Sequence, residues 1–195
     1  MKILAFVDIH GGIKTLNKII DKSHSADLLV CAGDLTVFEQ NMDLMLSMLN
    51  KIGKPVLIIP GNHETSTNLK KACSLFKNII YLHKRSYEAE NYLFLGHGGG
   101  GFSTYNPKFE KIAKVFSRKI TNEKKVVFIS HEPPYGTKLD LINGHCGSKS
   151  LRKFIKENNL KLVICGHLHE NKNKIDKIDN TLIINPGYYG KIINI

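Results

Sequence analysis

Seven short apolar runs, each followed directly by glycine or by a polar residue, restrict the possible folds of this chain more than any other feature. They are residues 2–7, 27–32, 55–60, 92–97, 125–130, 161–166 and 181–186. Runs of this length that are rich in Val, Ile and Leu are typical of strands buried on both faces. They predict an α/β protein whose sheets are covered by helices.

Amphipathic segments lie between several of these runs and predict the helices, at residues 13–22, 38–52, 107–120 and 148–159. Leu16 and Ile19 share one helical face, and the stripe of Met45, Met48 and Leu49 is expected in the core. Residues 172–195 show no helical period and predict strands joined by turns, one of them at residues 179–180. The pattern fits either a central mixed sheet or two stacked sheets, with helices outside.

Length and composition indicate one folded domain over residues 1–195, without linkers, repeats or low-complexity segments. No apolar stretch approaches the roughly 18–20 residues of a membrane span. The first apolar run is too short for a signal peptide and is followed by Asp8. The four cysteines form no C-x-x-C pair, and disulfides are not expected. We therefore expect a cytoplasmic protein that is not attached to a membrane.

The formal net charge is +11, which raises the possibility of a nucleic-acid partner. However, the chain has only the arginines Arg85, Arg118 and Arg152, and its lysines are scattered without a run of five. This pattern favours a solvated lysine-rich surface over a dedicated nucleic-acid module. A mildly positive field would still attract a phosphorylated substrate.

Polar residues of metal-ligand type stand directly after five of the apolar runs. The candidate ligands are Asp8, His10, Asp34, Asn62, His131, His167 and His169, and His63 and Glu64 adjoin them. In open α/β sheets, ligands bind beyond the carboxyl ends of the strands. We therefore expect these side chains to converge in one crevice.

Seven nitrogen and oxygen ligands without a thiolate are too many for one tetrahedral zinc ion. They suit two divalent ions of higher coordination number, for which Mn, Fe, Co, Ni and Zn are candidates and manganese is the first expectation. A carboxylate has two oxygens and can bridge both ions. Two ions about 3.5–4 Å apart form the two-metal arrangement that hydrolyses phosphate esters.

The order of these motifs resembles that of the calcineurin-like metallophosphoesterase superfamily. Its D-x-H, G-D, G-N-H-E, His and G-H-x-H series appears here as Asp8/His10, Gly33-Asp34, Gly61 to Glu64, His131 and Gly166 to His169. The resemblance spans residues 8–169. It implies a layered αββα sandwich of two mixed sheets flanked by helices.

The resemblance also implies a role for each motif residue. Asp8, His10 and His169 would hold one ion, Asn62, His131 and His167 the other, and Asp34 would bridge them. His63 would face the substrate, stabilise the phosphoryl oxygens and protonate the leaving oxygen. Glu64 would orient a neighbouring ligand or loop. The implied activity is phosphodiester or nucleotide-type ester hydrolysis by in-line attack of a hydroxide shared by the two ions.

One departure narrows the substrate class. The phosphoprotein-phosphatase branch reads G-D-x-x-D-R-G, whereas this chain has Val37 at the second Asp and no following Arg. This argues against a protein Ser/Thr phosphatase. Residues 131–155 resemble instead the small cap-less branch of archaeal and bacterial enzymes related to the metallophosphoesterase-domain proteins. That resemblance implies small phosphate-ester or nucleotide substrates.

Gly96, Gly98 and Gly101 form a literal G-x-G-x-x-G after an apolar run. A dinucleotide-binding fingerprint belongs to the first βαβ unit, whereas this one lies mid-chain and the next helix is expected only near Pro107. We expect this glycine loop to lie near the metal crevice. His97, Tyr135, Lys138 and His145 are further candidates for substrate contact, with a surface or structural role as the alternative for each.

Two other functions fit parts of the pattern. A non-catalytic scaffold of the same fold could bind metal and a partner protein, but such relatives typically lose ligand or acid residues, and none is missing here. A nucleic-acid binder or a nuclease would fit the charge, although no separate recognition module is visible.

Overall fold

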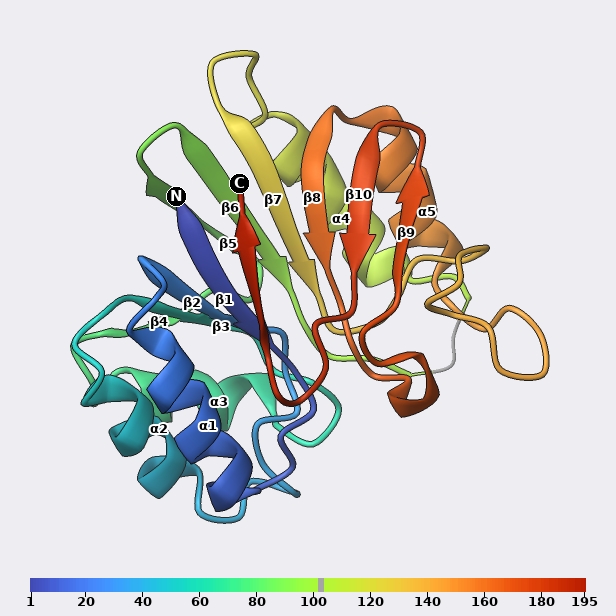
Figure 1. Cartoon of the computed structure of the whole chain (residues 1–195). Helices are drawn as coiled ribbons and strands as arrows, with labels where there is room; N and C mark the ends of the chain where they lie inside the picture. The colour runs from blue at the N-terminus through green and yellow to red at the C-terminus, as the bar shows by residue number, and fades with distance from the viewer. Residues whose placement is uncertain (102–103) are drawn as a thin grey trace.

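The computed structural model describes residues 1–101 and 104–195 and places two β-sheets face to face between two layers of helices (Figure 1). Sheet A has the strand order β11–β1–β2–β3–β4. Its strands are β1 (Lys2–Phe6), β2 (Leu28–Cys31), β3 (Val56–Ile58), β4 (Ile79–Tyr81) and β11 (Lys191–Asn194). Strands β1 to β4 are parallel, and β11 pairs antiparallel with β1.

Sheet B has the strand order β5–β6–β7–β8–β10–β9. Its strands are β5 (Arg85–Ala89), β6 (Tyr92–His97), β7 (Lys125–Ser130), β8 (Leu160–Ile164), β9 (Ile175–Ile178) and β10 (Thr181–Ile184). The inner strands are parallel, while β5 and β9 pair antiparallel at the two edges. The predicted αββα sandwich of two mixed sheets is confirmed, and the alternative of a single central sheet is wrong.

Among the residues that the structure describes, five α-helices cover the outer faces of the two sheets (Figure 1). Helices α1 (Ile13–Ser23), α2 (Met42–Asn50) and α3 (Ser66–Cys73) lie on sheet A, and α4 (Pro107–Ser117) and α5 (Lys149–Glu157) lie on sheet B. Helix α2 begins four residues later than the predicted segment 38–52, because Phe38, Glu39 and Asn41 adopt positive φ angles. The left-handed region does not continue a right-handed helix.

Alternation along the strands builds the layers of the core. Leu4 and Phe6 pack under the helices of sheet A, whereas Ile3 and Ala5 belong to the core between the sheets. Successive strand residues point to opposite faces, so one strand serves two cores. A third core fills the space between sheet B and its helices, and it contains Phe109, Phe116, Phe128 and Phe154.

The carboxyl ends of β1, β2 and β3 meet those of β7 and β8 at one edge of the sandwich (Figure 1). Gly166, after β8, permits this approach, because a Cβ there would lie 2.2 Å from Cγ2 of Val7 after β1. Across the same edge, Nδ1 of His131 donates to the carbonyl of Ala32 at 2.9 Å. Loops from both sheets therefore face one another at this edge.

Candidate metal centre

Sharp turns at the strand ends direct the candidate ligands into the crevice between the sheets. Asp8, His10, Asp34 and His167 have φ angles of 58°, 47°, 50° and 70°. This left-handed region is uncommon for residues other than glycine and costs of order 1–3 kcal/mol for each. Such strain persists only where the surrounding structure imposes it, and four of the seven predicted ligands carry it.

Asp34 lies between two groups of imidazoles. Its Oδ2 is 3.3 Å from Nε2 of His131 and 3.8 Å from Nε2 of His10. Its Oδ1 accepts a hydrogen bond from the backbone N–H of His63 at 2.9 Å. Burial alone would raise the pKa of Asp34, but the hydrogen bond and charge of His131, with the His63 N–H and His10, outweigh it and lower the pKa to about 2.

On one side of Asp34, the side chains of Asp8, His10 and His169 offer ligand atoms within 4.8 Å of one another. The two Nε2 atoms of His10 and His169 are 3.0 Å apart. Asp8 is buried and accepts the backbone N–H of His167 at 3.1 Å. Burial raises the pKa of Asp8 to about 6, against the opposing charge of His131. Together these atoms are a carboxylate and two imidazoles directed at one point.

On the other side, His131 lies near Asn62 and His167. Because Nδ1 of His131 donates to Ala32, its Nε2 carries the lone pair in the neutral ring. That Nε2 is 3.1 Å from Oδ1 of Asn62, and the His131 and His167 ring centroids are 5.1 Å apart.

These contacts test whether the site fits metal ions. When the His131 ring is neutral, its Nε2 carries a lone pair and faces two further lone-pair atoms, Oδ2 of Asp34 and Oδ1 of Asn62. Such a cluster requires a proton or a cation. Burial opposes charge on His131, yet the hydrogen bond to Asp34 and the nearby carboxylates raise its pKa. The donor set is all nitrogen and oxygen and fits divalent ions.

His63 extends from the loop after β3 over the same centre. Its ring stands edge-on to the ring of His10 at 4.8 Å, and the exposed ring of Phe38 lies 4.5 Å away. Ligand atoms of His63, His10 and Asp34 also lie within 4.8 Å of one another. The distances therefore allow His63 either to face the substrate or to bind an ion.

Glu64 links the loop after β2 to the loop after β3. Its buried carboxylate accepts the backbone N–H groups of Asp34 at 3.1 Å, Thr36 at 2.8 Å and Gly61 at 2.9 Å. It also accepts the hydroxyl of Thr36 at 2.8 Å. Thr36 was not among the predicted site residues, and its place two residues after Asp34 is the signal in the sequence that points to it.

Residues 1–171 match the family profile described as calcineurin-like phosphoesterase. The chain belongs to this family. The predicted resemblance is thereby confirmed. Calcineurin-like phosphoesterases are metal-dependent hydrolases of phosphate esters, and the ligand clusters around Asp34 agree with that dependence.

This calcineurin-like phosphoesterase is similar in sequence to an archaeal protein and in fold to proteins from a bacterium and a fish. An uncharacterized protein of Methanocaldococcus jannaschii, MJ1162, is 33% identical over 198 residues, which cover 95% of this chain and 88% of the relative. The crystal structure of TT1561 of Thermus thermophilus aligns with a TM-score of 0.79 at 18% identity, over 95% of this chain and 88% of that one. A dimetal phosphatase from Danio rerio aligns with a TM-score of 0.68 at 10% identity, over 94% and 86%. These two structural likenesses concern the fold.

The four further candidates for substrate contact lie in different surroundings. His97 is buried at the end of β6 under the glycine loop, and Tyr135 and His145 form a pair with ring centroids 5.5 Å apart. Lys138 lies towards β9, where its backbone N–H donates to Asp176 at 2.8 Å. The glycine loop itself lies beside the centre, since a Cβ on Gly100 would be 3.4 Å from Cδ2 of His131.

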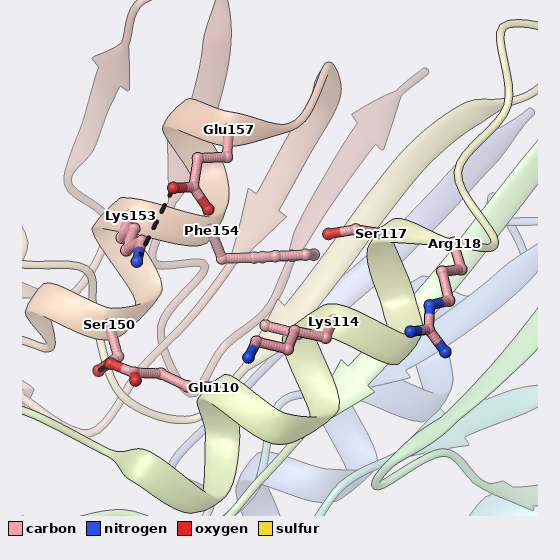
Figure 2. Close-up of a pocket in the computed structure, with 9 residues that line it drawn as sticks. Glu110, Lys114, Ser117, Arg118, Ser150, Lys153, Phe154 and Glu157 are labelled. Atoms are coloured by element: carbon pink, nitrogen blue, oxygen red, sulfur yellow. Dashed lines mark hydrogen bonds and ion pairs between the residues drawn. The ribbon is translucent and has the colours of Figure 1, made fainter.

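A separate cavity of about 410 Å³ lies between α4 and α5 on the outer face of sheet B (Figure 2). Lys153 pairs with Glu157 in this groove, and Glu110 accepts the hydroxyl of Ser150 at 2.8 Å. Four of its polar side chains thus form two pairs at the helix surface, away from the candidate metal centre. In the part of the chain that the structure describes, no helix is long and apolar enough to cross a membrane.

Proposed function

We propose that the chain is a dinuclear metal-dependent phosphoesterase that hydrolyses phosphodiester or nucleotide-type phosphate esters. The observation that carries this proposal is the place of Asp34. One of its carboxylate oxygens lies within 3.8 Å of imidazoles from both flanking groups. A carboxylate so placed is suited to bridge two ions.

The proposed ligands divide as the two flanking groups do. Asp8, His10 and His169 would hold one ion, Asn62, His131 and His167 the other, and Asp34 both. When bound, two divalent ions would lower the pKa of a shared water and neutralise charge on the phosphoryl group. Manganese is the first candidate for both ions, with Fe, Ni, Co or Zn as the alternatives.

His63 is proposed to act on the substrate. The hydrogen bond from its backbone N–H to Asp34 fixes its loop at the centre, and its ring stands over His10. From there the imidazole would donate a hydrogen bond to the phosphoryl oxygens and a proton to the leaving oxygen. Glu64 would hold the backbone of Asp34 and Gly61 in register for both tasks.

Three observations support a small anionic substrate. The net charge of +11 favours approach of a phosphate ester. One structural neighbour is described as an archaeal phosphodiesterase, and that name agrees with a diester substrate. Val37, in place of the acid of protein phosphatases, agrees with a non-protein substrate.

The test is reconstitution of the chelated protein with Mn, followed by elemental analysis and hydrolysis of bis-p-nitrophenyl phosphate and p-nitrophenyl phosphate. We expect two equivalents of metal per chain and a higher kcat/KM for the diester. No turnover of either ester with Mn, Fe, Co, Ni or Zn would contradict the proposed activity. Saturation at one equivalent would contradict the dinuclear site.

A further inference from the structure

The loop between β7 and α5 contains a carboxylate that the proposed reaction does not use. Asp140 is fully buried, and it accepts the backbone N–H groups of Gly136 at 3.0 Å, Thr137 at 2.7 Å and Gly147 at 3.0 Å. Burying a charged carboxylate is costly unless donors surround it. These backbone donors already fix the shape of the loop.

Asp140 also holds an exposed imidazole. Nδ1 of His145 donates to Oδ1 of Asp140 at 2.8 Å, and the His145 side chain is 39% exposed. This bond fixes the ring orientation and leaves Nε2 for another partner. The hydrogen bond between Asp140 and His145 adds little to the stability of a loop that backbone hydrogen bonds already hold. The fixed orientation of this exposed imidazole therefore points to a binding role.

A lysine is held beside this histidine. Nζ of Lys149 lies 4.9 Å from the ring centroid of Tyr135 and 5.3 Å from that of Tyr105, and the Tyr135 ring adjoins His145. Cation–π contacts hold an ammonium in place without neutralising its charge. None of the ion pairs among the described residues involves Lys149. The pair of His145 and Lys149 therefore has the character of an anion site.

The cluster lies on the same rim as the metal centre. Tyr135 follows His131 by four residues, so their Cα atoms are at most about 14 Å apart. Asn171, two residues after His169, fastens the loop to this rim by donating to the carbonyl of Leu139 at 2.8 Å. Figure 1 shows that this loop leaves the end of β7 and extends past β9, where Lys138 N–H donates to Asp176. A substrate that occupied both places would have to extend from the metal centre along this loop.

We infer that Lys149 and His145 form a subsite for a second phosphate of the substrate whose scissile phosphate occupies the metal centre. Asp140 is the positioning residue of this subsite, because it acts through His145. The inference rests on the proposed function and narrows its substrate class to phosphodiesters that carry a further phosphate group, such as a 5′-phosphorylated dinucleotide.

The test compares two substrates that differ only in that group, the dinucleotide pApA and its counterpart ApA without the 5′-phosphate. We expect the wild-type protein to prefer pApA by at least tenfold in kcat/KM. In Lys149→Met, and in a Lys149→Met/His145→Gln double variant, the ratio should fall towards one. Lys156→Met, an exposed position on the same helix, is the matched control and should keep the wild-type ratio.

Binding of pApA and ApA to the chelated protein, measured by calorimetry, gives a readout without turnover. We expect pApA to bind more tightly than ApA to the wild type, and this difference to vanish in Lys149→Met. Asp140→Asn alone should reduce this difference in affinity between pApA and ApA. When it is added to His145→Gln, it should reduce the difference no further.

The outcomes separate the two proposals. A wild type that hydrolyses bis-p-nitrophenyl phosphate but treats pApA and ApA alike, or a preference unchanged in Lys149→Met, overturns the subsite alone. Failure to hydrolyse any ester overturns the proposed activity, and the binding comparison then decides the subsite on its own.

Discussion

At the scale of single residues, Asp34 and His63 occupy the same centre but make different contacts. The side chain of Asp34 is 2% exposed and faces imidazoles on both sides. His63 donates a hydrogen bond to Asp34 from its backbone N–H, and its ring lies beside the exposed Phe38. In the proposed site, loss of the Asp34 side chain would remove a ligand of both ions, whereas loss of the His63 side chain would leave both ligand sets complete.

Alanine variants of these two residues should therefore differ. Asp34→Ala should empty both sites and abolish activity. His63→Ala should keep near-normal metal content while kcat falls by roughly 10²-fold or more, as expected for loss of an acid or electrostatic stabiliser. Elemental analysis and single-substrate kinetics of each variant check this. If His63→Ala lost its metal, His63 would be a ligand, which its place near His10 and Asp34 also allows.

At the scale of elements, the sequence predicted the inner strands and the residues that follow them, because both depend on local patterns. Gly166 and the motif His167 to His169 follow an apolar run that forms most of the buried strand β8. The turn at residues 179–180 between β9 and β10 was likewise confirmed, with a positive φ at Asp179.

Other elements were missed because tertiary contacts define them. Helix α3 has only eight residues, and its signal is the capping of Asn68 N–H by Thr65 within a segment that reads as scattered lysines. Strand β4 has three residues and exists through its pairing with β3. Likewise, the cluster around Asp140 depends on a loop conformation that no periodicity describes.

The loops after β2 and β3 should depend on Glu64 for their stability. Each carboxylate oxygen accepts two donors, so the amide of Glu64→Gln would place an N–H group against N–H or O–H donors in either orientation. We expect a loss of roughly 2 kcal/mol or more in the free energy of unfolding, measured with urea. Glu157→Gln, an exposed acid on α5, is the control and should change it by less than about 0.5 kcal/mol. Equal stabilities of the two variants would contradict the role assigned to Glu64.

At the scale of the whole molecule, the centre exists only while both sheets are packed. Asp8 and Asp34 come from sheet A, and His131 and His167 come from sheet B. The hydrogen bond from His131 to Ala32 crosses the two layers. Ions that bind this arrangement and not the unfolded chain would stabilise it by mass action, so metal binding and global unfolding are linked.

The packing of sheet B also makes global stability sensitive to acid. His97 is 9% exposed, with its ring 5.1 Å from His83 and 4.8 Å from Phe109. Burial lowers the pKa of His97 to about 3 and that of His83 to about 4, and nearby Lys84 adds to both shifts. In the unfolded chain, histidine pKa values lie near 6.5. The unfolded chain therefore binds protons at pH values at which these two histidines stay neutral in the folded chain.

The free energy of unfolding should therefore have its full value above about pH 6.5. As the pH decreases towards 4, it should fall by up to about 1.4 kcal/mol per pH unit for each histidine. His97→Gln removes one of these groups. We expect the free energy of unfolding to drop between pH 7 and pH 5 by roughly 1–2 kcal/mol less in this variant than in the wild type. Urea titrations of metal-free protein at both pH values measure this, because the histidines of the metal centre then contribute equally to both proteins.

His24→Gln, at an exposed position, is the control and should retain the wild-type dependence of stability on pH. If His97→Gln lost as much stability on acidification as the wild type, the buried imidazole would not be the source of the acid sensitivity.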